Sequence, residues 1–262
     1  MKLTLLGTGN GAMLPVYGCD CKACRRAIAD PQYRRNKTSA MLEHQGKTLL
    51  LDANLPDLLR RFPSGTIDRI LLTHYHIDHV QSLFDLSTGV GSSIPVYGPY
   101  DEQGCDNLYK YPGILKFQPP LGAFQTFEWQ GIAITAIPLN HSRACLGYVF
   151  EWCGKRIAYL TDTYGLSDAA IQWFQIHPVE WMFIDCGYTP LDVRGDIPTR
   201  NHSTFEQIED IQRRCKPKHV RLLHISHAFE NWAMDAAGYF TDSLALAHDG
   251  QSVDYSTTNV ND

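Results

Sequence analysis

The chain has 262 residues and a formal net charge of −5, and 44% of its residues are hydrophobic. This length accommodates one large domain or two small ones, with a sizeable core. The net charge gives no overall basic surface for nucleic acid, although a local basic patch stays open. No apolar run approaches the ~20 residues of a membrane-spanning helix, and the apolar start is too short for a signal peptide. We therefore expect a soluble, cytoplasmic protein.

The first predicted strand covers residues 2–6 and leads into the glycine-rich segment 7–11. This segment matches neither a P-loop nor a dinucleotide-binding fingerprint. It is either a tight turn that brings backbone close to a site or a plain connection. The spacing of the glycines does not choose between the two.

Three of the 8 cysteines are clustered, as Cys19, Cys21 and Cys24. The C-x-C-x-x-C spacing places three thiols within reach of one tetrahedral zinc ion, which then needs a fourth ligand from elsewhere. Without a metal, thiols at this spacing are a redox liability, so we interpret the cluster as a structural metal site and not as free cysteines. The scattered cysteines are expected to be buried apolar residues, because a chain of this length without a secretion signal is unlike a disulfide scaffold.

Strands and helices alternate through the rest of the chain. Further strands are predicted at residues 39–43, 48–51, 70–72, 95–97, 124–129, 132–137, 147–151, 156–160, 181–184 and 219–223. Helices are predicted at residues 55–62, 80–84, 166–175, 205–215 and 229–237. Ser203 or Thr204 is expected to cap the helix at 205–215, with Glu206 as the capping-box partner of Ser203.

This pattern indicates one domain over residues 1–253, followed by a polar tail at 254–262. Two β-sheets packed together with helices outside fit it best. The basic segment 31–37, with Arg34, Arg35 and Lys37, is interpreted as a solvated surface. A polar loop is expected over residues 192–200.

The densest group of metal-type side chains follows the apolar run at 70–72: His74, His76, Asp78 and His79. His74 and His76 are two residues apart, so in an extended segment they point the same way and can share one ion. Asp78 and His79 lie where the chain turns into a helix, and they are free to face a second ion. A loop that only caps a helix through Asp78 has no need of three histidines. The pattern H-x-H-x-D-H therefore predicts a metal-binding loop.

Three more strands end in side chains of the same kind, namely His141, Asp162 and His224. The ends of strands in packed sheets can converge on one rim, so we expect these side chains to join the loop. The simplest partition gives one ion to His74, His76 and His141, and a second ion to Asp78, His79 and His224. Asp162 then bridges both ions through its two oxygens. Asp52, at the end of the strand at 48–51, is expected to orient a ligand histidine from behind.

The charges of such a centre indicate the class of substrate. Two divalent ions carry one more charge than two carboxylates and one hydroxide together, which suits an anionic substrate. A phosphodiester fits best. A lactone or thioester stays open, because the same ions can polarise a carbonyl group.

Segments spread over nearly the whole chain resemble the metallo-β-lactamase superfamily, and more narrowly its PhnP-type phosphodiesterases of the carbon–phosphorus lyase pathway. These segments are residues 6–9, 19–24, 31–35, 72–81, 95–99, 101–106, 139–142, 201–202 and 224–227. The segments without catalytic chemistry discriminate within the superfamily, since the H-x-H-x-D-H loop alone indicates only the superfamily.

The resemblance implies an α/β fold, the αββα sandwich of the metallo-β-lactamase type, and a dinuclear centre made of the ligands above. It implies hydrolysis of 5-phosphoribosyl 1,2-cyclic phosphate to ribose 1,5-bisphosphate in phosphonate catabolism. It also implies a structural Zn²⁺ held by Cys19, Cys21, Cys24 and His227. Mn²⁺ is favoured in the active site, although nitrogen and oxygen ligands accept Zn²⁺ as well. A homodimer is what the family suggests.

The resemblance also implies roles for residues beside the centre. His202 is expected to protonate the departing sugar oxygen as general acid, and Asp78 is counted as catalytic through its ion. Asn201 and Asp185 are further candidates near the site. Arg143 is expected to meet the 5-phosphate of the substrate, unless it is an ordinary solvated surface arginine. Asn54 stands where many members have glycine, and asparagine tolerates the left-handed conformation.

Rival functions remain within the same superfamily. A tRNA 3′-end processing nuclease shares the L-G-T-G start, but the net charge of −5 and the lack of an evident RNA-gripping arm argue against it. A lactonase or thioesterase is a second rival. A non-catalytic metal-binding protein is a third, and the complete ligand set argues against such a decayed site. The expected partner is a small anionic phosphodiester, with neither nucleic acid nor a membrane.

Overall fold

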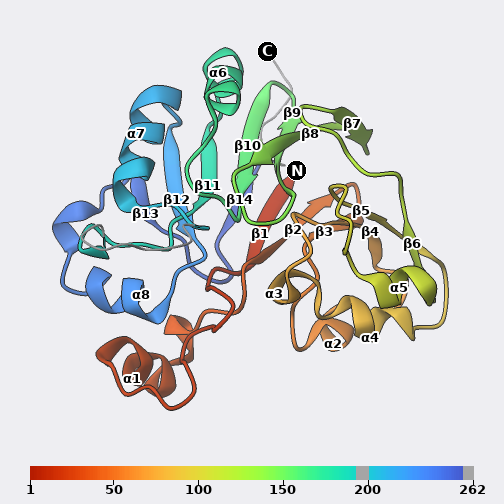
Figure 1. Cartoon of the computed structure of the whole chain (residues 1–262), viewed down its shortest axis with the longest axis horizontal. Helices are drawn as coiled ribbons and strands as arrows, with labels where there is room; N and C mark the ends of the chain where they lie inside the picture. Colours follow the sequence, from red (N-terminus) through yellow and green to blue (C-terminus); the bar gives the residue numbers. More distant parts are fainter. Residues whose placement is uncertain (193–200, 256–262) are drawn as a thin grey trace.

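The computed structural model describes residues 1–192 and 201–255. These residues form two mixed seven-stranded sheets that face each other, with helices on their outer sides (Figure 1). The strand order is β14-β1-β2-β3-β4-β5-β6 in the first sheet and β13-β12-β11-β10-β9-β8-β7 in the second. This arrangement is the αββα sandwich that the sequence predicts.

The first sheet comes from the first half of the chain and one returning strand. Its strands are β1 (Lys2–Gly7), β2 (Ser39–His44), β3 (Lys47–Leu51), β4 (Ile67–Leu71), β5 (Ile94–Tyr97), β6 (Leu115–Phe117) and β14 (Ser252–Asp254). The helices of this half are α1 (Lys22–Ala29), the 3-10 turn Pro31–Tyr33, α2 (Leu58–Arg61), α3 (Ile77–Val80), α4 (Leu83–Ser87) and α5 (Asp106–Lys110).

The second sheet comes from the second half. Its strands are β7 (Thr126–Trp129), β8 (Ile132–Leu139), β9 (Cys145–Trp152), β10 (Lys155–Leu160), β11 (Trp181–Asp185), β12 (His219–Leu223) and β13 (Leu244–Leu246). Its helices are α6 (Asp168–Ile176), α7 (Phe205–Cys215), α8 (His227–Ala233) and the 3-10 turn Ala237–Tyr239. None of the helices in the described residues is long and apolar enough to cross a membrane.

Alternating side chains of each strand supply the apolar layers of the sandwich. In β10, Ile157 and Tyr159 face the core between the sheets, whereas Ala158 and Leu160 face the layer under α6 and α7. The period of two places successive side chains on opposite faces. Strands buried on both faces are therefore almost continuously apolar, as in parallel sheets covered by helices.

The directions of the strands determine where the loops that follow them lie. β10, β11 and β12 are parallel neighbours, and so are β3, β4 and β5. The loops after their carboxyl ends meet at one edge of the sandwich, where Gly9 pairs with both Lys37 and Ile225. The glycine-rich segment is thus a close backbone approach and not a plain connection. A Cβ at Gly7 would lie 1.9 Å from the carbonyl oxygen of Lys37, so only glycine fits there.

Two local predictions need correction. Thr204, one of the two predicted caps, does cap α7, but its capping-box partner is Gln207 and not Glu206. The Ser203 hydroxyl donates to the carbonyl oxygen of Thr163 instead. The polar tail does not begin at residue 254, since Asp254 pairs with Lys2 in β14 and Tyr255 is buried.

Other expectations concern single residues and one loop. Cys153 is exposed, unlike the remaining scattered cysteines, which are buried. Most of the predicted polar loop at 192–200 lies outside the described residues.

Candidate metal centre

The first ligand group comes from the loops after β4 and β8. Nδ1 of His76 lies 3.0 Å from Nε2 of His74 and 3.0 Å from Nε2 of His141. A tetrahedral ion with Zn–N distances of about 2.0–2.1 Å separates its nitrogens by about 3.3 Å. The three ring nitrogens therefore converge closely enough to hold one ion, in the combination that the sequence predicts.

The second group combines α3 with the end of β12. Oδ2 of Asp78 lies 3.7 Å from Nε2 of His79 and 3.8 Å from Nε2 of His224. Nε2 of His224 is buried and has no hydrogen-bond partner among the described residues. An unpartnered buried nitrogen that faces a carboxylate and a second imidazole fits the donor set of a divalent ion.

Asp162 lies between the two groups. Its Oδ2 faces four Nε2 atoms, at 3.4 Å (His79), 3.4 Å (His224), 3.7 Å (His74) and 3.9 Å (His141). Its Oδ1 accepts a hydrogen bond from the hydroxyl of Thr161 at 2.5 Å. One oxygen therefore faces both groups, whereas the sequence predicts a bridge through both oxygens.

Burial and charge prepare these side chains for cations. Burial lowers the pKa of His74 well below its ordinary value, and it also lowers the pKa of His76 and of His141. These imidazoles are therefore neutral at pH 7, and each offers a lone pair. Burial opposes ionisation of Asp78 and Asp162, but His224 and His79 outweigh it and hold the pKa of both carboxyls below the usual range. Neutral imidazole and ionised carboxylate are the forms that metal binding requires.

A buried carboxylate orients His79, as the sequence predicts for Asp52. Nδ1 of His79 lies 2.7 Å from Oδ2 of Asp52, and the backbone N–H of Thr73 donates to Oδ1 of Asp52 at 2.8 Å. This contact leaves Nε2 of His79 for an ion. Burial works against a charged imidazole, yet Asp162 and Asp52 raise the pKa of His79 well above its ordinary value. The position of Nε2 therefore stabilises positive charge.

The left-handed residue of this turn is Asp52, with φ of 63°, and not Asn54. Asn54 has another task, because its side-chain N–H groups donate to the carbonyl oxygens of Thr38 and Asp78, each at 2.7 Å. It thereby anchors the backbone of a ligand. Gly11 approaches the same ligand, since a Cβ there would lie 2.8 Å from Oδ2 of Asp78. Neither role follows from the spacing of these residues in the sequence.

His202 lies at the side of the second group. Its Nδ1 is 2.8 Å from Oδ2 of Asp185, and its ring stacks on that of His224 with centroids 4.4 Å apart. Burial lowers the stability of the charged ring, but Asp185 outweighs burial and raises the pKa of His202 to about 9. His202 thus carries a proton at neutral pH, and its Nε2 is the atom free of the Asp185 contact. Its neighbour Asn201 accepts a hydrogen bond from Nδ1 of His141 through its carbonyl oxygen, at 3.0 Å.

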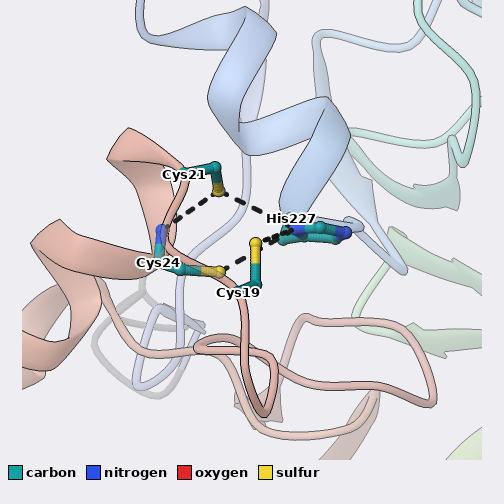
Figure 2. A group of neighbouring side chains, drawn as sticks. All are labelled: Cys19, Cys21, Cys24 and His227. Atoms are coloured by element: carbon teal, nitrogen blue, oxygen red, sulfur yellow. Dashed lines mark hydrogen bonds between the residues drawn. The ribbon is translucent and has the colours of Figure 1, made fainter.

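The cysteine cluster forms a separate site on the first turn of α8 (Figure 2). Nδ1 of His227 lies 3.3, 3.7 and 3.8 Å from the Sγ atoms of Cys19, Cys21 and Cys24. A tetrahedral zinc ion with Zn–S of about 2.3 Å and Zn–N of about 2.0 Å separates sulfur from nitrogen by about 3.5 Å. The three nitrogen–sulfur distances therefore fit edges of one such tetrahedron, and all four ligand atoms lie within 4.8 Å of one another. Cys21 also caps α1, which the sequence does not predict, by accepting from the backbone N–H of Cys24.

Arg143 makes its described contacts with the protein itself. Its Nε and Nη2 donate to the two oxygens of Asp101 at 2.8 and 2.5 Å, and its Nη1 donates to the carbonyl oxygen of Tyr75 at 2.7 Å. A bidentate pair of this kind fixes the guanidinium in one orientation. These contacts favour a structural role at the base of the metal-binding loop over contact with a substrate phosphate.

Comparison with known proteins places this geometry in a family. Residues 48–225 match the model of the beta-lactamase superfamily domain. The chain is 28% identical to an octanoyltransferase of Porphyromonas gingivalis over 87% of its own length, but it spans only 46% of that protein. It is also 28% identical to ribonuclease Z of Clostridioides difficile, over 75% of this chain and 65% of the relative.

Two solved structures share this fold over nearly the full length of the chain. A diphosphatase of the PhnP family is 29% identical, with a TM-score of 0.76 and 96% of each chain covered. Zn²⁺-bound PqqB of Methylobacterium extorquens has a TM-score of 0.77 at 20% identity, with 97% of this chain and 100% of PqqB covered. The family model spans both halves of the sandwich and the ligand groups from His74 to His224. The chain therefore belongs to the beta-lactamase superfamily, and it shares the fold of the metal-dependent hydrolases in that superfamily.

Proposed function

We propose that the protein is a binuclear metal-dependent phosphodiesterase that acts on a small anionic phosphodiester. The physiological substrate we propose is 5-phosphoribosyl 1,2-cyclic phosphate, hydrolysed to ribose 1,5-bisphosphate in phosphonate catabolism. One observation carries the proposal: His202, whose Nδ1 lies 2.8 Å from Oδ2 of Asp185, stacks on a ligand of the second ion group. A sugar alkoxide is a poor leaving group, and a protonated His202 supplies the proton that it needs.

The residues divide the work between binding and proton transfer. His74, His76 and His141 would hold one ion, Asp78, His79 and His224 the other, and Asp162 both. When bound, divalent ions lower the pKa of water and offset the charge of phosphoryl oxygens. His202 then donates from Nε2 to the departing oxygen, while Asp185 keeps the proton on Nδ1 and stabilises the charged ring.

The metals follow from donor chemistry. The active-site groups contain only nitrogen and oxygen donors, which accept Mn²⁺ or Zn²⁺, and we favour Mn²⁺ there. Three thiols and an imidazole favour Zn²⁺ in the cysteine cluster. We propose that the protein assembles as a homodimer and that its partner is a small substrate, not nucleic acid or a membrane.

The similarity to a PhnP-family diphosphatase over 96% of both chains supports this class of substrate. It also supports a second candidate, hydrolysis of a diphosphate ester, because attack at phosphorus and protonation of a leaving oxygen are common to both reactions. The relatives named octanoyltransferase and ribonuclease Z bring acyl transfer and RNA cleavage as further possibilities, and the sequence analysis leaves thioester and precursor-tRNA hydrolysis open.

A panel of substrates tests the proposal. The purified protein is assayed with bis(p-nitrophenyl) phosphate with and without Mn²⁺, and with the cyclic ribose phosphate followed by phosphorus NMR. A diphosphate diester, precursor tRNA and an octanoyl thioester are the competing substrates, and His141→Ala from the same preparation controls for contaminating activity. We expect Mn²⁺-dependent opening of the cyclic ester with the highest kcat/KM. A higher kcat/KM for any competitor overturns the substrate assignment.

A further inference from the structure

A buried arginine, Arg35, contacts both the segment beside the ligand His224 and the helix that carries His227 of the cysteine cluster. Arg35 is only 7% exposed, in contrast to the solvated surface predicted for residues 31–37. Its Nε donates to Oε2 of Glu230 at 2.8 Å. Its Nη1 donates to the hydroxyl of Thr8 and to the carbonyl oxygen of Ala247, both at 2.6 Å. A guanidinium so deeply buried persists only where its donors are satisfied, and its planar fork then fixes several partners at once.

The partners of Arg35 lie on both sides of the turn from His224 to His227. The carbonyl oxygen of Thr8 accepts from the backbone N–H of Ile225 at 2.9 Å, directly after the ligand His224. Glu230 belongs to α8, whose first residue, His227, faces the cysteine cluster. Arg35 therefore holds the glycine-rich segment on one side of this turn and α8 on the other.

His224 depends on such support. Its φ of 59° is left-handed, a conformation that a residue with a side chain keeps only when its surroundings impose it. In this conformation its Nε2 lies 3.4 Å from Oδ2 of Asp162 and 3.8 Å from Oδ2 of Asp78. A small rotation of the backbone would carry Nε2 away from both carboxylates. The affinity of the second group for an ion thus depends on the backbone next to His224.

Further hydrogen bonds from Thr8, Asn36 and Arg26 to Asp249 and Glu230 complete the network around Arg35. The Thr8 hydroxyl donates to Oδ1 of Asp249 at 2.7 Å, and Oδ2 of Asp249 accepts from the backbone N–H of Asn36 at 2.7 Å. Arg26 donates to Oε1 of Glu230 at 2.5 Å. Both arginines contact Glu230, but in the described residues only Arg35 also contacts Thr8. Arg35 therefore connects Glu230 to the glycine-rich segment, whose Thr8 carbonyl oxygen binds Ile225.

We propose that Arg35 is a positioning residue for the second ion group. Through Thr8 and Glu230 it fixes the turn that carries His224, and so it sets the affinity of Asp78, His79 and His224 for their ion without touching ion or substrate. This inference rests on the binuclear centre of the proposed function but not on the identity of its substrate.

Metal binding is the direct test, with Arg26→Lys as the matched control for Arg35→Lys. Both variants keep a cation beside Glu230, but only Arg35→Lys loses the fork that reaches Thr8 and Ala247. Metal-free proteins are titrated with Co²⁺ against a competing chelator, and bound ions are counted and followed by absorption. His224→Ala and His141→Ala provide the reference signatures for loss of each active-site ion.

We expect Arg35→Lys to weaken the ion that His224→Ala also removes, by about tenfold or more. The other active-site ion and the thiolate-bound ion keep their affinity, and Arg26→Lys binds all ions like the unmodified protein. Equal weakening of both active-site ions, unchanged affinities with only a lower Tm, or the same loss in Arg26→Lys overturns the proposal.

A second variant covers the case in which Arg35→Lys does not fold. Thr8→Val keeps the shape of the side chain and removes the hydroxyl between Arg35 and Asp249, so it must show the same selective loss. Unchanged metal affinities in folded Thr8→Val overturn the proposal. Because these readouts need no substrate, failure of the phosphodiesterase assignment leaves them intact, and the reverse also holds.

Discussion

The imidazole ring of His202 lies flat against that of His224, with centroids 4.4 Å apart and planes 17° apart. His224 faces Asp78 and Asp162, whereas Nδ1 of His202 faces Asp185 at 2.8 Å. The two rings therefore stack on each other, but their nitrogens face different carboxylates. This arrangement places His202 beside His224, and the ligand atom of His202 also lies within 4.8 Å of those of Asp162, Asp185 and His224, so the role of His202 as acid or as ligand needs a direct test.

Replacement of His202 by alanine tests its role as acid. We expect turnover of an alkyl phosphodiester, which has a poor leaving group, to fall by about 10²–10⁴-fold. Turnover of bis(p-nitrophenyl) phosphate should fall far less, because p-nitrophenolate leaves without a proton. Equal losses for good and poor leaving groups would exclude the acid role, and loss of one bound ion would show that His202 is a ligand instead.

Asp185→Asn tests how the pKa of His202 is set. Asp185 raises that pKa to about 9, so the imidazolium is present at neutral pH and is lost as the pH rises through the pKa. We expect kcat/KM to fall as the pH rises. The midpoint of this fall should lie below pH 9, because bound cations disfavour the charged ring and so lower the pKa of His202. Asp185→Asn should move this limb to lower pH by about one unit or more. A limb that stays in place would mean that another group controls it.

Asp52→Asn tests the contact behind His79. The amide cannot balance a charged ring, and we expect the affinity for the ion held by His79 to fall by about 10–100-fold. Asp85→Asn, at an exposed carboxylate of α4, is the control and should bind ions normally. Competition with a chelator measures both, and equal affinities in the two variants would contradict the orienting role.

Cys21→Ser tests the cysteine cluster against the exposed thiol of Cys153. We expect Cys21→Ser to lose one zinc per chain by elemental analysis and to lower the free energy of unfolding by about 3 kcal/mol or more, because a structural ion stabilises only the folded chain. Cys153→Ser should change neither quantity. Full zinc content and unchanged Tm in Cys21→Ser would mean that the cluster holds no structural ion.

Arg143→Gln separates the structural role of Arg143 from contact with substrate. Loss of the bidentate pair leaves the partly buried carboxylate of Asp101 without its cation, so we expect a loss of about 1 kcal/mol of stability. KM for the cyclic phosphate should stay within about twofold of the unmodified value. A tenfold rise in KM with an unchanged Tm would restore the phosphate-binding role.

Local pattern is enough to predict much of the architecture. The apolar runs predict β4, β10, β11 and β12, and metal-type side chains follow β4, β10 and β12 within three residues of the strand end. Parallel strands end at the same edge, so convergence of the ligands follows from their positions along the chain. The α7 helix is predicted with its observed bounds because its apolar residues repeat at helical spacing.

Contacts between distant parts of the chain are beyond such reasoning. Arg35 reaches Glu230 across 195 positions, and this burial separates it from its exposed neighbour Arg34. In the same way, Arg143 contacts Asp101 across 42 positions.

The sequence by itself determined which side chains stand at the strand ends, because strand periodicity and the chemistry of metal ligands are local properties. Only the tertiary structure decided which atom of each side chain faces the other ligand atoms and which is held by a neighbour. That choice depends on how the two sheets pack and on the register of loops that meet across the sandwich.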